Sequence, residues 1–297
     1  MAELDVGGLD VAGYLARLGV TNPGPPSIEA LRVLHRAHVE QVPYENIEIQ
    51  LGRPTTVDPR ESADRIVRRH RGGYCFHLNG AFAALLAALG YDVRWHVGGV
   101  QGRGDPAPVG PIGNHLALTV HGLPTQECPD GVWFVDAGLG DGLYEPLPLR
   151  PGLFRQGPFE YAVTASDVIA GGWRFGHDRT GSFTGMDFGP TVAAPADFAV
   201  QHVRLSTSPE SGFVRVCSAQ RRDATGVDVL RGLVLSRVDG QDTAAERELS
   251  TRSEWYGVLA DVFGLALGDL SGDERDALWD RVLQAHEAWA ASRAAGG

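Results

Sequence analysis

One cysteine of this chain lies where its thiol could act as a nucleophile. Cys75 stands in the segment RGGYCFHLNG (71–80), shortly after two glycines and at the start of a helical pattern of apolar residues. The positive end of a helix lowers the pKa of a thiol, and the thiolate is the reactive species. Glycines allow the sharp turn that must precede such a helix. The alternative is that Cys75 is a small buried apolar residue, as many free cysteines are.

A thiol nucleophile needs a base, and the base needs a group that orients it. In residues 114–120 (NHLALTV), strand alternation places His115 on the face opposite to the leucines, which are expected to point into the core. In residues 133–136 (WFVD), Asp136 shares a face with Phe134. A turn-rich loop, HGLPTQECPDG, joins the two segments. An antiparallel hairpin closed by this loop would bring His115 and Asp136 together and give a Cys–His–Asp arrangement.

Each member of this arrangement has a plainer interpretation. His115 is one of ten histidines and could be a hydrogen-bonded residue on a sheet face. Asp136 could open the turn DAGLGDG, because aspartate is a common turn residue. Cys128, in a turn-rich loop, and Cys217, in an expected strand, do not follow a helix start and are predicted to be inert. Three widely spaced cysteines fit neither a disulfide framework nor a metal site, so no metal is predicted.

The composition argues against several classes of protein. With 297 residues, 43% hydrophobic and 21% charged, the chain can bury a large core in one or two domains. Its formal net charge of −11 argues against a general nucleic-acid-binding protein. The N-terminal sequence MAELDVGGLD lacks the basic and apolar parts of a secretory signal, and no apolar run is long enough to span a membrane. We predict a cytoplasmic protein, and the sequence leaves its oligomeric state open.

Helical and strand patterns divide the chain into a helical part, a strand-rich part and a mixed part. Ser27 is expected to cap a helix that starts at Ile28, and the helix from Cys75 is expected to stop at Gly90. Further helical patterns cover 63–69, 254–262 and 274–290. The expected strands are 91–100, 115–120, 132–136, 161–164, 173–175 and 213–217.

Several blocks of the sequence resemble, in the same order, those of the arylamine N-acetyltransferase family. They span about 200 residues, and the combination of RGGxC with a later strand histidine and VDxGxG is highly specific. The matching blocks are YLARLG (14–19), PYENIEIQLGRP (43–54), RRHRGGYCFHLNG (68–80), NHLALTV (114–120), FVDAGLGDG (134–142) and VRLSTSPESGF (203–213).

The resemblance implies an α+β fold with an N-terminal helical bundle, a central antiparallel β-barrel, a C-terminal α/β lid and a cysteine-protease-like core. The corresponding divisions of the chain are 1–90, 91–205 and 206–297. It also implies an acyltransferase without a bound cofactor. An acyl group would pass from acetyl-CoA, or another acyl-CoA, to an arylamine or hydrazine in ping-pong order, through a thioester on the enzyme.

The resemblance assigns roles to individual residues. Cys75 would accept the acyl group, His115 would be its base and Asp136 would orient the base. Arg17 and Glu45 match positions that support these three. The residues that match substrate-contacting positions are Tyr44 and Leu139 for the acceptor and Gly138 and Gly140 for CoA.

Several features depart from the family pattern. His77 stands where the family usually has Glu or Gln, and Asn114 stands where Thr or Ser usually precedes the histidine. Leu139 replaces a common Phe, which alters the expected acceptor pocket. The loop GRGDPAPVGPIG (102–113) is long and rich in glycine and proline. The run RRHR (68–71) is typical of a solvated helix end, with a contact to a CoA phosphate as the alternative.

Three other functions stand beside the acetyltransferase. An amide synthase that closes macrolactams in natural-product biosynthesis would keep the chemistry and change the donor and acceptor, and Leu139 and the 102–113 loop favour it. A cysteine hydrolase could use the same three groups. A non-catalytic binding module of the same fold is the third, and the retained cysteine, histidine and aspartate argue against it. The sequence leaves the role of His77 open.

Overall fold

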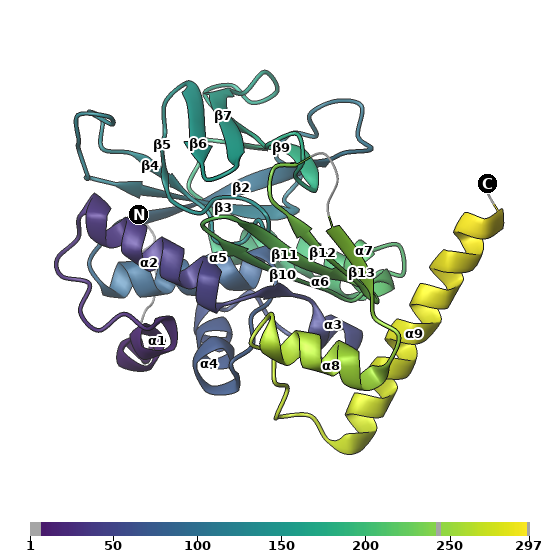
Figure 1. The fold of residues 1–297 in the computed structure, drawn as a ribbon. Helices are drawn as coiled ribbons and strands as arrows, with labels where there is room; N and C mark the ends of the chain where they lie inside the picture. Colours follow the sequence, from purple (N-terminus) through teal and green to yellow (C-terminus); the bar gives the residue numbers. More distant parts are fainter. Residues whose placement is uncertain (1–6, 242–244, 296–297) are drawn as a thin grey trace.

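The computed structural model describes residues 7–241 and 245–295 and combines a helical part with two antiparallel sheets. Figure 1 shows the larger sheet above the N-terminal helices and the smaller sheet beside it. The last helix, α9, runs along the edge of the molecule, and its C-terminal end extends away from the body (Figure 1). Three regions can therefore be distinguished in Figure 1: the N-terminal helices, the larger sheet, and the smaller sheet with the C-terminal helices.

Five helices form the N-terminal part. They are α1 (Val11–Leu18), α2 (Ile28–Gln41), α3 (Ile47–Gln50), α4 (Pro59–Arg69) and α5 (Cys75–Ala88). As predicted, Ser27 caps α2, because its side chain accepts a hydrogen bond from the Ala30 N–H at 3.2 Å. Of the 14 residues of α5, 12 are buried, which is typical of a helix in the centre of a core. The helix ends at Ala88, and Gly90, with φ of 90°, provides the predicted stop.

The larger sheet has eight antiparallel strands in the order β5-β4-β3-β2-β9-β8-β7-β6. The strands are β2 (Asp92–Gly102), β3 (His115–His121), β4 (Trp133–Val135), β5 (Leu147–Pro148), β6 (Gly152–Gln156), β7 (Phe159–Ala165), β8 (Trp173–Gly176) and β9 (Phe183–Phe188). The end strands β5 and β6 follow one another in the chain, and the sheet curls into a nearly closed barrel. Phe134, Phe175 and Phe188 lie in its apolar interior. The other face of β3 packs on α5 through Leu116 and Leu118.

The smaller sheet is built from distant parts of the chain. Its strands are β1 (Tyr44–Glu45), β10 (Ser218–Asp223), β11 (Gly226–Arg231), β12 (Val234–Val238) and β13 (Ala245–Glu248), in that order. The C-terminal helices α8 (Arg252–Asp261) and α9 (Gly272–Ala295) share an apolar cluster with this sheet around Trp255. The connection from the barrel contains η1 (Pro195–Phe198), α6 (Ala199–Thr207) and α7 (Gly212–Arg215).

Most of the predicted elements are confirmed, and one expected strand is wrong. Residues 213–217 do not form a strand. Most of them lie in the helical turn α7, because the Ser211 side chain caps that turn by accepting from the Phe213 N–H at 3.2 Å. The expected core face of β3 is confirmed by Leu116 and Leu118, and the barrel interior also covers Ala117 on the opposite face.

The division of the chain into three parts at 90/91 and 205/206 stays a prediction. The first position lies between α5 and β2, and the second lies inside α6. Within the described residues, none of the helices has the length and apolar character of a membrane span.

Candidate active site

Cys75 is the first residue of α5 and follows a tightly packed turn. The residue is 4% exposed. A side chain on Gly72 would have no room, since its Cβ would lie 1.8 Å from the Pro43 carbonyl oxygen. The Gly73 carbonyl accepts a hydrogen bond from the Glu45 N–H at 2.9 Å. The two glycines therefore let the chain pass against residues 43–45 and enter the helix, as the sequence predicts.

His115 begins β3 and contacts the two other residues of the predicted arrangement. Its Nε2 lies 2.7 Å from Oδ2 of Asp136, and Cys75 lies close enough for its charge to act on the imidazole ring. The Cys75 sulfur also lies 3.7 Å from the Asn114 carbonyl oxygen. The antiparallel pairing of β3 with β4 brings Asp136 to His115, which confirms the predicted hairpin. The structure thus brings Cys75, His115 and Asp136 together in one buried set of contacts.

The charges in this set favour a protonated histidine. Burial alone would lower the pKa of His115, but the charges of Asp136 and Cys75 and the hydrogen bonds to both outweigh burial and raise it to about 10. His115 is therefore an imidazolium at neutral pH. An imidazolium beside a cysteine stabilises the thiolate, and the N-terminus of α5 acts in the same direction.

Asn79 connects the nucleophile helix to the carboxylate, and the sequence predictions missed it. Its Nδ2 donates to Oδ1 of Asp136 at 2.8 Å and to the Leu116 carbonyl at 2.7 Å, while its Oδ1 accepts from the Ala137 N–H at 2.8 Å. Asn79 is fully buried. The available signal was its position four residues after Cys75, which places both side chains on one face of α5.

The loop after Asp136 packs directly on the nucleophile. The Gly138 N–H donates to Oδ1 of Asp136 at 2.9 Å, and a Cβ on Gly138 would lie 2.8 Å from Cα of Cys75. Gly140 has φ of 70°, and a Cβ there would lie 2.2 Å from Oε1 of Gln220. Leu139 is almost buried and packs in the interior of the barrel. This close approach explains why glycines stand at both positions.

Two hollows lie on either side of the segment between α6 and α7. One has a volume of about 240 Å³ and is lined by residues that include Tyr44 and Phe213. The other has a volume of about 320 Å³ and is lined by residues that include Asn114 and Arg204. Burial, and then the charge of nearby Cys75, raises the pKa of Tyr44 well above its ordinary value. Each hollow is thus lined by a residue that lies near the sulfur, Tyr44 or Asn114, although Cys75 itself lines neither.

Arg17 and Glu45, the two residues expected to support the triad, lie in different parts of the fold and contact different partners. Arg17 donates from Nη2 to the Gln41 carbonyl at 2.5 Å, so it ties α1 to α2. Glu45 accepts from the Ile47 N–H at 2.5 Å, and its Oε1 lies 3.6 Å from Nε of Arg71. Arg71 is fully buried, which contradicts the expectation of a solvated helix end for this residue of the RRHR run. The carboxylates around Arg71 explain its burial.

His77 and Asn114, two departures from the family pattern, both make close contacts. The ring of His77 packs edge-on against Tyr74 and His202, with centroids 4.7 Å and 5.5 Å away. Burial, followed by the charges of Arg65 and His202, holds the pKa of His77 well below its usual value, so its ring is neutral. The Asn114 side chain accepts from the N–H and donates to the carbonyl of one β2 residue, Val100, at 2.8 Å and 3.3 Å. Asn114 therefore fixes the start of β3 against β2.

The remaining cysteines take no part in this site. Cys128 and Cys217 are buried free thiols, and burial raises the pKa of Cys217 to about 12. Among the residues that the structure describes, no cluster of three or more histidine, cysteine, aspartate or glutamate side chains could hold a metal ion.

Known proteins share this sequence and fold over most of the chain. A family model described as N-acetyltransferase matches residues 27–271. An arylamine N-acetyltransferase of Mycolicibacterium smegmatis is 30% identical over 93% of this chain and 98% of that protein. The resemblance predicted from the sequence blocks is therefore confirmed.

Two solved structures show the same likeness in three dimensions. The arylamine N-acetyltransferase of Nocardia farcinica matches with a TM-score of 0.80 at 31% identity, over 93% of this chain and 95% of that one. The arylamine N-acetyltransferase of Mycobacterium marinum, solved in complex with CoA, matches with a TM-score of 0.80 at 27% identity, over 92% and 98% of the two chains. These matches confirm the predicted α+β class with its helical bundle, antiparallel barrel, α/β lid and cysteine-protease-like core.

Proposed function

The chain belongs to the arylamine N-acetyltransferase family, and we propose that it transfers acetyl groups from acetyl-CoA to arylamine or hydrazine nitrogens through a thioester on Cys75. Membership of the family makes the chain an acyltransferase. The observation that carries the finer proposal is the set of contacts that links Cys75, His115 and Asp136 at the N-terminus of α5. The CoA bound to the M. marinum relative supports an acyl-CoA donor.

In the first half-reaction the Cys75 thiolate attacks the carbonyl carbon of acetyl-CoA and forms a new carbon–sulfur bond. The bond to the CoA sulfur then breaks, and His115 gives its proton to the departing thiolate. CoA leaves as a thiol. The enzyme retains an acetyl group on Cys75 beside a neutral imidazole.

In the second half-reaction the nitrogen of the acceptor attacks the carbonyl carbon of acetyl-Cys75. His115 takes a proton from that nitrogen as the carbon–sulfur bond breaks, so an amide is released and the thiolate–imidazolium pair returns. Asp136 bonds Nε2 of His115, which leaves the other ring nitrogen for the sulfur and the substrates. Burial of the three side chains favours the amine over water as the acceptor.

The hollows beside the α6–α7 segment support access of a donor and an acceptor to Cys75. Tyr44 borders one hollow and Asn114 borders the other, and both residues lie next to the nucleophile. We assign the acyl donor and the acceptor to these two hollows, without specifying which hollow binds which substrate. This arrangement lets CoA depart before the acceptor nitrogen reaches the thioester.

The intact mass of the protein tests the thioester directly. Incubation with acetyl-CoA is expected to add one acetyl group to the wild type and none to Cys75→Ala, with an equal amount of free CoA released. Adding an arylamine or a hydrazine is expected to remove the acetyl group as an amide. A wild-type protein that gains no mass from acetyl-CoA or from other short acyl-CoAs would exclude the proposal.

A second candidate is an amide synthase that closes macrolactams, and Leu139 favours it. This leucine is smaller than the phenylalanine common at the position, but it is buried in the barrel interior and lines neither of the two hollows, so the support for this candidate comes from the sequence difference alone. The same chemistry would then act on a larger acyl donor and aryl amine. Rapid acetylation of simple arylamines or hydrazines would count against this candidate.

A further inference from the structure

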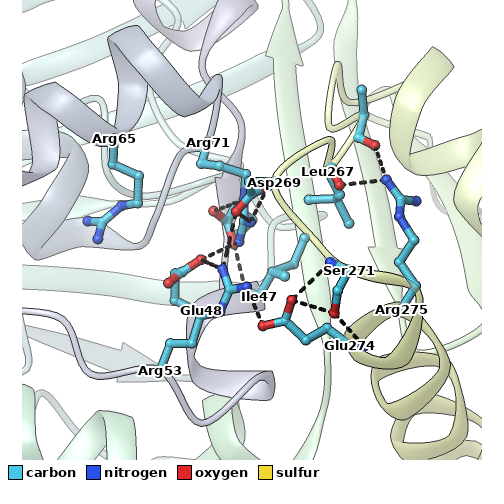
Figure 2. Close-up of polar contacts among 12 residues, drawn as sticks. Ile47, Glu48, Arg53, Arg65, Arg71, Leu267, Asp269, Ser271, Glu274 and Arg275 are labelled. Atoms are coloured by element: carbon cyan, nitrogen blue, oxygen red, sulfur yellow. Dashed lines mark hydrogen bonds and ion pairs between the residues drawn. The ribbon is translucent and has the colours of Figure 1, made fainter.

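We propose that Asp269, in the loop before α9, is a positioning residue for Cys75 that acts through the buried side chain of Arg71. Figure 2 shows Arg71 and Asp269 facing each other, with Glu48 and Arg53 beside them. The inference rests on the proposed function, because it concerns the reactivity of the Cys75 thiol. According to this inference, the C-terminal segment helps to hold the Cys75 sulfur in place beside His115.

Arg71 is fully buried, and each of its three guanidinium nitrogens faces a different carboxylate. Nε lies 3.6 Å from Glu45, Nη2 lies 3.0 Å from Glu48 and Nη1 lies 3.4 Å from Asp269. Of these three contacts, only the one with Asp269 also has hydrogen-bond geometry, to both carboxylate oxygens. Glu45 and Glu48 come from the N-terminal part of the chain, so Asp269 is the partner that the C-terminal segment supplies.

The guanidinium is close to the nucleophile along the chain. Arg71 opens the turn that leads through Gly72 and Gly73 to Cys75. This turn is confined by Pro43 on one side and by the hydrogen bond between Gly73 and Glu45 on another. A displacement of the Arg71 side chain therefore acts on a turn that has little room to absorb it, and the first residue of α5 moves with the turn.

A second arginine extends the same network into α9. Arg53 lies 3.2 Å from Asp269, 3.5 Å from Glu48 and 2.6 Å from Glu274 (Figure 2). Glu274 lies beyond residue 271, where the match to the family model ends. The loop before α9 and the first turn of α9 are thus bound by charge to the turn that carries the nucleophile.

A buried guanidinium is stable only where its N–H groups meet negative charge. Without the Asp269 charge, Nη1 loses its hydrogen-bonded carboxylate and the side chain is drawn toward Glu48 and Glu45. The turn and the sulfur shift with it relative to His115. The thiolate then loses part of its stabilisation by the imidazolium, and because the thiolate is the reactive form, the sulfur reacts more slowly at neutral pH.

The test is the alkylation of Cys75 by iodoacetamide in the full-length protein, followed by peptide mass from about pH 5 to about pH 9. Asp269→Asn keeps the shape and removes the charge. Because the sulfur then lies further from the imidazolium, we expect alkylation to slow by about tenfold at neutral pH and the pH profile to move to higher pH. Asp269→Glu keeps the charge one methylene further out, and we expect an intermediate rate. The matched control is Asp276→Asn, which removes a nearby carboxylate, on α9, that pairs with Arg252 outside this network. We expect the control to alkylate at the wild-type rate.

The outcomes separate this inference from the proposed function. A wild type whose Cys75 reacts no faster than Cys128 and Cys217 would contradict the proposed function. A wild-type Cys75 that reacts fast, with the same rate and pH profile in folded Asp269→Asn, would overturn only the positioning role. If Asp269→Asn does not fold, Asp269→Ser, which also removes the charge, takes its place, and a wild-type rate and pH profile in that variant overturn the positioning role.

Discussion

Nε2 of His115 lies 2.7 Å from Oδ2 of Asp136, although the two residues stand 21 positions apart in the chain. The other carboxylate oxygen, Oδ1, accepts from Asn79 and from the Gly138 N–H. Both oxygens of Asp136 are therefore occupied by donors from three different elements. A carboxylate held in this way cannot rotate away from the imidazole, so it fixes which ring nitrogen faces the sulfur.

Asn79→Ala is expected to weaken both the fold and the active site. The change removes one of the donors to Asp136 and takes from the Leu116 carbonyl and the Ala137 N–H their bonds to the Asn79 side chain, and a buried polar group left unpaired costs about 1–3 kcal/mol. We expect the free energy of unfolding in urea to fall by several kcal/mol and acylation by acetyl-CoA to slow. Asn22→Ala, at an exposed turn, is the control and is expected to change neither. Unchanged acylation in a folded Asn79→Ala protein would contradict this role.

Asp136→Asn is expected to lower the acylation rate by about 10²- to 10⁴-fold, because the amide removes the charge that keeps His115 protonated. The pH dependence should change as well. Without that charge, the pKa of His115 falls from its value of about 10, and the activity that depends on imidazolium is lost at a lower pH. Pre-steady-state release of CoA as a function of pH measures both effects. The same alkaline limit in wild type and variant would argue against an imidazolium.

The contribution of His115 to stability has a definite pH window. Its folded pKa of about 10 lies above the ordinary value of 6.5, so the folded protein holds a proton that the unfolded chain releases between these values. The contribution is fully present below about pH 6.5 and is lost as the pH rises toward about 10. The difference in unfolding free energy between wild type and His115→Gln should therefore shrink over this range. A difference that grows with pH would have the wrong sign.

Gly138→Ala is expected to damage the site through steric contact alone. The new Cβ would lie 2.8 Å from Cα of Cys75 and 2.9 Å from Nδ2 of Asn79, so α5 or the loop must move. Overpacking of this kind costs about 1–3 kcal/mol. We expect a lower melting temperature and slower acylation. Gly104→Ala, which meets nothing within 4 Å, is the matched control and should leave both unchanged.

Three buried histidines predict a loss of stability in acid. Burial is the main cause that lowers the pKa of His35 to about 4, of His38 to about 3 and of His96 to about 4. Below about pH 6.5 the unfolded chain binds protons that the folded protein excludes, so stability falls as the pH falls toward 4, by about 1.4 kcal/mol per pH unit for each histidine. Urea unfolding at several pH values measures the slope. His96→Gln removes one of these histidines and should reduce the slope by about 1.4 kcal/mol per pH unit. A wild-type stability that does not change with pH in this range would contradict the argument.

The residues of the triad could be predicted because the signals that identify them are local. Cys75 stands at a helix start marked by glycines, and His115 and Asp136 stand on two alternating strands joined by a turn-rich loop. A helix start or a hairpin determines where its own side chains lie, so these patterns predict positions without knowledge of distant segments. Asn79 lies one helical turn beyond Cys75, and the same pattern could have identified it.

The remaining features depend on contacts between distant segments, which local patterns do not encode. Arg71 is buried among carboxylates that include Asp269, nearly 200 positions later, and nothing in RRHR indicates this. Arg17 matches a family block, yet its partner is a backbone carbonyl of α2. Residues 213–217 carry strand-forming side chains, but the capping hydroxyl of Ser211 and the packing of α6 on α7 place residues 212–215 in a helical turn.

The strand β1 has a consequence for how the enzyme is made. Tyr44 and Glu45 pair with Gln220 and Ala219 of β10, and Tyr44 also bridges to Gly73 in the turn before Cys75. A nascent chain that has not yet reached β10 therefore lacks the main partner of this strand, although helices α1 to α7 and the barrel strands are already synthesised. The turn at the nucleophile acquires its full support only late in translation, so a chain truncated at the ribosome carries the three reactive side chains without the assembled centre.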